Sequence, residues 1–209
     1  MDRRVLAGVV LSAAAAAAVA QTPPGLWFDP TQLPSFTGNV ECFLVNTAGE
    51  TDGLLFREGP QVIIPPPVGE SVRKAVPVGR PLVVWGIRAR SAPVITMLAW
   101  APDTSTEPSF VERPWWRLPD VASSTVMLSV EGEVRSPYFS PQGEAVGIIL
   151  TDGTVIRMPP EAVAALGDRV KPGARLAVEG RGNESERGRA LLAERIGPSP
   201  DKLEPVPTR

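Results

Sequence analysis

Five short stretches rich in hydrophobic residues in the second half of the chain predict β-strands, and the first of them alternates between hydrophobic and polar residues as half-buried strands do. These stretches are residues 126–134, 145–151, 154–158, 175–180 and 190–196. Asp152-Gly153 separates the second stretch from the third and predicts a tight hairpin turn with positive φ at the glycine. Residues 161–166 are alanine-rich, follow Pro160 and precede Gly167, so they predict a helix of one to two turns.

The first half of the chain repeats the second. Sliding the sequence along itself by 94 positions aligns residues 38–99 with residues 132–193 without a gap. The identities gather at glycine, proline and apolar positions, where chance matches would not concentrate. Examples are Gly38 with Gly132, Gly49 with Gly143, Gly59 with Gly153 and Gly86 with Gly180. A repeat of this length predicts two similar domains and not a solenoid of short units. The first copy has Pro67-Val68-Gly69 in place of the helix, which predicts a loop there.

The order strand–strand–strand–helix–strand–strand is that of an OB-fold, a five-stranded Greek-key barrel. We therefore expect an all-β protein with a short helix, built from two tandem five-stranded OB-fold-like Greek-key barrels. Residues 141–160, with their Asp152-Gly-Thr turn and Pro-Pro end, and residues 171–180, which begin Lys171-Pro-Gly, also resemble a group of exported bacterial OB-like proteins, many of them uncharacterised. The resemblance covers the second copy well and the first loosely, and it implies a fold more than an activity.

The remaining segments suggest an exported protein. Residues 1–20 have a charged start, an apolar stretch and the small-residue cleavage site Ala18-Val19-Ala20, as in a secretory signal peptide. The paired arginines at the start leave twin-arginine export as an alternative. A proline-rich segment (21–37) then precedes the first barrel (38–100), a Pro/Trp linker (101–124), the second barrel (125–196) and a tail expected to be disordered (197–209). The predicted location is the periplasm or the outside of the cell, with no membrane span.

The amino-acid composition disfavours several kinds of catalytic and metal-binding site. The chain has no histidine and only one cysteine, Cys42, so we expect no histidine-based triad, no intrachain disulfide, no metal site and no cofactor. Without residues 1–20 the net charge is about −3, whereas nucleic-acid binders usually have a basic balance. The acidic residues Glu50 and Glu144 recur in both copies, but each lies beside a glycine in a turn. We therefore predict that the protein is not an enzyme.

Binding residues can be proposed from the places where OB-folds hold ligands, which are the face of strands two and three and the loops 1–2 and 4–5. In the second copy these are Tyr138, Phe139, Arg157, Arg181, Arg187 and Arg189. Aromatic rings beside arginines suit single-stranded nucleic acid, although the same residues can cap the barrel and form a solvated rim. Trp85, Trp115 and Trp116 are candidates for contact with a partner, although Trp115 and Trp116 can instead pack the linker onto a barrel.

Two functions are compatible with these patterns. The first is a non-catalytic exported protein that binds a protein or polymer partner in the cell envelope through its barrels. The second is a tandem OB protein that binds single-stranded nucleic acid, which the acidic balance disfavours. The first copy has an apolar third strand and fewer arginines, so we expect it to pack against the second copy or against another protein.

Overall fold

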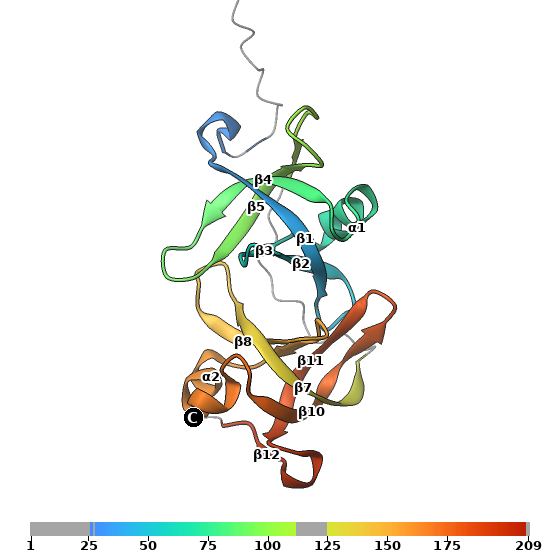
Figure 1. The fold of residues 1–209 in the computed structure, drawn as a ribbon, viewed down its shortest axis with the longest axis vertical. Coiled ribbons are helices and arrows are strands. Elements are labelled where there is room, and N and C mark those ends of the chain that lie inside the picture. The colour runs from blue at the N-terminus through green and yellow to red at the C-terminus, as the bar shows by residue number, and fades with distance from the viewer. Residues whose placement is uncertain (1–25, 27, 112–124, 208–209) are drawn as a thin grey trace, which may run out of the picture.

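The computed structural model describes residues 26, 28–111 and 125–207 and places in them two β-barrels, one above the other along the longest axis (Figure 1). Each barrel belongs to a six-stranded sheet in which five strands close on themselves. The prediction of two tandem OB-like barrels is therefore confirmed.

The first barrel is formed by one run of chain. Its elements are a 3-10 helix η1 (Pro30–Gln32), β1 (Ser35–Val45), β2 (Thr51–Phe56), β3 (Gln61–Ile63), α1 (Pro66–Ala75), β4 (Pro81–Arg88), β5 (Val94–Ala101) and β6 (Ser109–Phe110).

The second barrel repeats this order after the linker. Its elements are β7 (Val126–Phe139), β8 (Ala145–Leu150), β9 (Val155–Arg157), α2 (Pro160–Leu166), the 3-10 helix η2 (Gly167–Val170), β10 (Arg175–Ser185), β11 (Gly188–Gly197), the 3-10 helix η3 (Pro200–Lys202) and β12 (Glu204–Pro205).

The strands pair in the same way in both barrels. β1 pairs antiparallel with β2 and β4, β2 with β3, and β4 with β5, and a parallel pairing of β3 with β5 closes the ring. β7 to β11 follow the same scheme, with β9 parallel to β11. A short extra strand, β6 or β12, pairs with the last strand of each barrel. These two short strands lie outside the barrel limits expected from the sequence.

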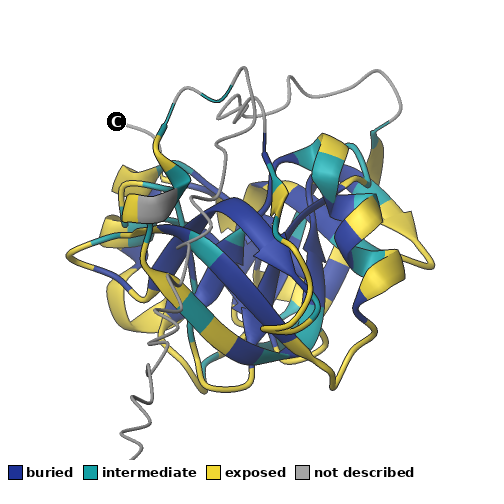
Figure 2. Ribbon diagram, turned by 90° about the horizontal axis from the view of Figure 1, so that it is seen from above, coloured by how far each residue is buried: buried dark blue, intermediate teal, exposed yellow. Residues whose placement is uncertain are grey.

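Each barrel encloses its own apolar core, and the strands seen from above are largely buried while the loops are exposed (Figure 2). The first core contains Leu54, Val62 and Ile95, and the second contains Ile148, Ile156 and Leu191, all with no more than 1% of their surface exposed. Such fully buried aliphatic side chains each stabilise a fold by roughly 1.5–3 kcal/mol relative to an exposed position. The two halves thus fold around separate interiors.

A matched pair of glycines bends the fourth strand of each barrel. The register shifts between Trp85 and Gly86 in β4, and between Glu179 and Gly180 in β10. A Cβ atom on Gly86 would lie 2.0 Å from the carbonyl oxygen of Thr96, and one on Gly180 would lie 1.9 Å from that of Leu192. Only glycine permits this approach of two backbones, which is why the position is the same in both copies.

The predicted loop in the first copy is wrong, because α1 occupies that position and is longer than α2. Proline is favourable in the first turn of a helix, where its missing N–H would have no partner, so Pro66 and Pro67 begin α1. Gly69 lies inside the helix, where its lack of a side chain lets α1 approach the carbonyl of Thr51 in β2. Close packing against the barrel therefore outweighs the low helix propensity of glycine.

The prediction of a disordered tail is also wrong as far as residue 207. β12 pairs with β11, and Leu203 and Val206 are buried. The prolines of the tail fit a short edge strand and a 3-10 turn, both of which tolerate a missing N–H. Within the part of the chain that the structure describes, no helix has the length and apolarity to cross a bilayer. Residues 1–20, predicted to be a signal peptide, lie outside the described residues.

Candidate functional site

The surface of each barrel that normally holds ligands in OB-folds is turned toward the other barrel. A third apolar cluster lies between the two cores and draws residues from both halves. It contains Leu44, Val45, Leu55, Tyr138, Ile149, Val155 and Ala190. We call this region the inter-barrel face. The expectation that the first copy packs against another surface is met by the second copy itself.

The ligand-binding hypothesis requires Arg157 to lie on an open surface. It lies instead in the inter-barrel face. Its residue is 8% exposed, and its guanidinium forms an ion pair with Asp52 of β2 in the first barrel. It also donates to the hydroxyl of Tyr138 over 2.8 Å and lies 5.0 Å from the centre of that ring. The strand position was predicted correctly, but the opposite barrel covers the side chain.

This buried network is incompletely satisfied. Among the described residues, Asp52 Oδ1 and Arg157 Nε have no hydrogen-bond partner. Burial raises the pKa of Asp52 to about 6, although Arg157 opposes the rise. Burial likewise raises the pKa of the Tyr138 hydroxyl, and the charge of Asp52 adds to that rise. The Asp52–Arg157 pair therefore carries a desolvation cost that its ion pair only partly offsets.

Tyr138 and Phe139 belong to the end of β7, because β7 extends further than the predicted first strand. Tyr138 is buried, and Phe139 is half-buried. The side chain of Gln61 in β3 accepts from the backbone N–H of Phe139 at 2.9 Å and donates to its carbonyl at 3.1 Å. The Gln61 side chain thus satisfies both backbone groups of Phe139, as a neighbouring strand would, and these two bonds join the two barrels.

The three arginines expected in a loop lie on or at the tip of the long β10–β11 hairpin, since β10 continues to Ser185. All three have acidic partners. Arg181 lies 3.5 Å from Glu194, and Arg187 lies 3.5 Å from Glu70 of α1. Arg189 lies 2.8 Å from Asp152 and 3.5 Å from Glu184. This pairing neutralises much of the positive charge that a phosphate-binding surface would use.

The tip of this hairpin also contacts the first barrel. Arg73 of α1 donates to the backbone carbonyl of Arg187 at 2.9 Å and lies 4.7 Å from the ring centre of Phe43. The space beside Gly188 is bounded by Val45 of β1. The hairpin thus lengthens the inter-barrel face beyond the apolar cluster.

A second ion pair crosses the inter-barrel face, between Glu41 of β1 and Arg135 of β7, each with 31% of its side chain exposed. Cys42 is next to it and half-buried, and burial raises the pKa of its thiol. A thiol with a raised pKa is mostly neutral and therefore a weak nucleophile.

The tryptophan candidates are not brought together. Trp85 lies on β4 and is half-buried, whereas Trp100, which is also in the first copy, is buried in the first core. Trp115 and Trp116 lie outside the described residues.

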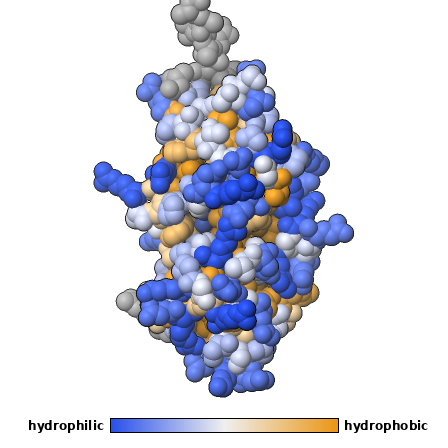
Figure 3. Space-filling model, in the orientation of Figure 1, coloured by the Kyte–Doolittle hydropathy of each residue, from blue (hydrophilic) through white to orange (hydrophobic). Residues whose placement is uncertain are grey.

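Sequence reasoning did not single out the exposed apolar residues of β7 and β11. Val126, Met127 and Leu192 are 55%, 57% and 37% exposed. Met127 is the neighbour of Arg181 in the β7–β10 pairing, and Leu192 is its neighbour in the β10–β11 pairing. We call Met127, Arg181 and Leu192 the outer patch. On the face of the molecule seen in Figure 3, hydrophobic and hydrophilic residues are interspersed.

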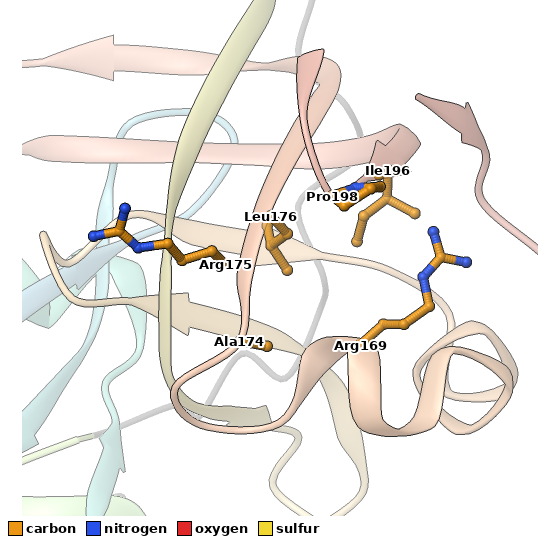
Figure 4. A pocket seen from close by; sticks show the side chains of 7 residues that line it. Arg169, Ala174, Arg175, Leu176, Ile196 and Pro198 are labelled. Carbon is orange, nitrogen blue, oxygen red and sulfur yellow. The ribbon is translucent and has the colours of Figure 1, made fainter. Parts of the chain in front are cut away.

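A hollow of about 100 Å³ lies at the end of the second barrel (Figure 4). Arg169 and Arg175 lie on opposite sides of Leu176 and Ile196, and the two guanidinium groups point away from each other. This arrangement does not converge on a ligand. Among the described residues there is also no group of three or more His, Cys, Asp or Glu side chains placed to hold a metal ion.

Comparison with known proteins adds no relationship: no family model, no curated protein and no solved structure matches the chain. The resemblance to exported OB-like proteins therefore stays a prediction.

Two of the residues that join the barrels differ between the two copies in a way that is visible in the sequence. Asp52 and Gln61 are polar, whereas their counterparts in the second copy are the apolar residues Val146 and Val155. A polar residue on an apolar strand of only one copy indicates a partner that is specific to that copy.

Proposed function

We propose that the chain is a non-catalytic exported protein that binds a protein partner in the cell envelope from the outside of its joined barrels. The observation that carries this proposal is the burial of the usual OB ligand surface. Tyr138 and Arg157 are covered by the first barrel, and the Gln61 side chain hydrogen-bonds to the backbone N–H and C=O of Phe139. A partner must then approach another surface.

The outer patch is the surface that best suits a protein partner. It places the exposed side chains of Met127 and Leu192 on either side of Arg181, and methionine and arginine are enriched in protein–protein interfaces. A carbohydrate or other polymer would instead favour a row of exposed aromatic rings, which the described part of this surface does not offer. Export rests on residues 1–20, whose charged start, apolar stretch and small-residue end support it.

Single-stranded nucleic acid is the competing function. In its favour are the fold and the number of arginines on the β10–β11 hairpin. Against it are the ion pairs of Arg181, Arg187 and Arg189 and the acidic balance of the chain. Phosphate contacts are strongest at low salt. Titration of labelled single-stranded DNA at low salt should show no saturable binding, and saturable binding there would favour nucleic acid over a protein partner.

The protein-partner proposal is tested with three baits that differ by one side chain. The wild-type protein, Met127→Glu and the control Val78→Glu are each incubated with envelope extract, and the bound proteins are identified by mass spectrometry. Val78 is 59% exposed on the first barrel, so the control adds the same charge to an equally open apolar site. We expect the wild type and Val78→Glu to capture a common protein that Met127→Glu loses. Equal capture by all three baits, or no capture above background, would contradict the proposal.

A further inference from the structure

The inter-barrel face has an internal symmetry. Residues that are 94 positions apart, and therefore equivalent in the two copies, lie together in the shared apolar cluster. Leu44 and its counterpart Tyr138 are both members, as are Leu55 and its counterpart Ile149. Equivalent residues of two subunits meet in this way when the subunits are related by a two-fold axis.

Contacts away from the cluster obey the same relation. A Cβ atom on Gly49 would lie 2.7 Å from the Asn183 side chain of the other barrel. The equivalent glycine, Gly143, lies against Ala89, where a Cβ atom would be 3.1 Å from the alanine side chain. Ala89 is the counterpart of Asn183, so each loop between the first two strands contacts the equivalent position, at or just beyond the end of the fourth strand, of the opposite barrel. One operation thus relates two separate contacts.

The axis itself is marked by an ion pair. Glu41 and Arg135 are counterparts, 94 positions apart, and they contact each other. In a symmetric pair of identical barrels, this contact would bring two identical side chains together. Two first barrels would set glutamate against glutamate, and two second barrels would set arginine against arginine.

The second ion pair lies off the axis and occurs only once. The symmetry operation carries Asp52 and Arg157 onto Val146 and Ile63, which are both apolar. In a pair of two first barrels, Asp52 would be buried against Ile63. In a pair of two second barrels, Arg157 would be buried against Val146. An unpaired charge at a covered position is strongly unfavourable.

We propose that each barrel presents one self-associating face, and that Glu41–Arg135 and Asp52–Arg157 restrict that face to unlike pairing, so that the partner of the first barrel is a second barrel and never another first barrel. Apolar residues shared by both copies supply the contact, and the four charged residues, which differ between the copies, supply the specificity. Discrimination of this kind comes from repulsive or unpaired charges in the wrong complex.

Charge exchange across the axis in the full chain tests the first part of this proposal. Arg135→Glu places two carboxylates on the axis, Glu41→Arg places two guanidinium groups there, and the double variant restores an ion pair with its direction reversed. We expect each single variant to lower the urea midpoint of unfolding by about 0.5–1 M. Because the surroundings of the axis are equivalent on both sides, the double variant should return close to the wild-type midpoint. If a single variant does not fold, the double variant still decides, since a double variant no better than the singles overturns the proposal.

Moving the off-axis pair to its symmetry-related position tests the two-fold relation directly. Asp52→Val with Arg157→Ile removes the pair, and Val146→Asp with Ile63→Arg builds it on the other side of the axis. The quadruple variant combines all four substitutions. If the two-fold relation is correct, this variant unfolds at a higher urea midpoint than either Val146→Asp or Ile63→Arg alone. A quadruple variant that is less stable than both of these single variants would show that residues 63 and 146 do not face each other, and the inference would fail.

Discussion

Asp52→Val is the change that most directly probes how the barrels are joined. The substitution leaves the guanidinium of Arg157 buried without its carboxylate, since the side chain of Arg157 is only 10% exposed. Its other polar contact in the described chain is the hydroxyl of Tyr138 at 2.8 Å. Valine is the residue at the equivalent position of the second copy, so the strand and the face can accommodate its shape.

The magnitude follows from the cost of an uncompensated charge. Removing one partner of a buried ion pair destabilises a protein by about 3–5 kcal/mol. For two barrels that unfold together, this lowers the melting temperature by roughly 6–20 °C, since each 1 kcal/mol shifts it by about 2–4 °C in a chain of this size. The double variant Asp52→Val with Arg157→Met removes both charges and keeps an apolar contact. We expect the double variant to recover most of the lost free energy of unfolding. It should remain about 1–2 kcal/mol less stable than the wild type, because the Tyr138 hydroxyl is left without its partner.

Chemical unfolding followed by two signals measures these effects. The described tryptophans, Trp85 and Trp100, lie in the first barrel, so their fluorescence reports on it, whereas far-ultraviolet circular dichroism follows both barrels. Coincidence of the two transitions shows that the barrels unfold together. The reasoning is refuted if Asp52→Val costs less than about 1 kcal/mol, or if the double variant is as unstable as the single one, because an uncompensated buried charge predicts a larger loss and its recovery.

Three further predictions concern single features of the fold. Because burial raises the pKa of Asp52 from 3.8 to about 6, the folded chain takes up this proton before the unfolded chain does. The contribution of this carboxyl to the free energy of unfolding should therefore grow as the pH falls from 6 to 4, and be lost as the pH rises through 6. The difference between the pH profiles of the wild type and Asp52→Asn measures this contribution. Gly69→Ala should lower the melting temperature although alanine is the better helix former, because its Cβ would lie 2.0 Å from a backbone oxygen of β2. Ser71→Ala, on the exposed side of α1, is the control and should be neutral or slightly stabilising in the same thermal assay. Truncation after Gly197 should lower the melting temperature, because it removes β12 and the buried Val206.

Each of these has a contrary result. A pH profile that is unchanged by Asp52→Asn would mean that the carboxyl has an ordinary pKa in the folded chain. A Gly69→Ala variant as stable as Ser71→Ala would mean that α1 can move away from β2 at no cost. An unchanged melting temperature after truncation would mean that the tail contributes nothing to the second barrel, as the sequence alone suggested.

The sequence by itself determined the architecture, because that depends on local periodicity and on glycines that recur. The predicted strands at residues 145–151 and 154–158 match β8 and β9 closely, and Gly153 has the positive φ that the hairpin turn requires. The doubled pattern was visible because each barrel must bury its own alternate residues, and this need leaves the same spacing in both copies.

Only the tertiary structure decided which surfaces remain free. Alternation shows that Arg157 points away from the core of its own barrel, but not that another barrel covers it. The helix α1 escaped prediction for a related reason, since the close approach of Gly69 to β2 rewards a residue that local propensity disfavours. Contacts between segments that are far apart in the chain leave no periodic signal of their own. The fold was therefore predictable from the pattern, whereas the burial of the second copy's expected ligand face by the first barrel was not.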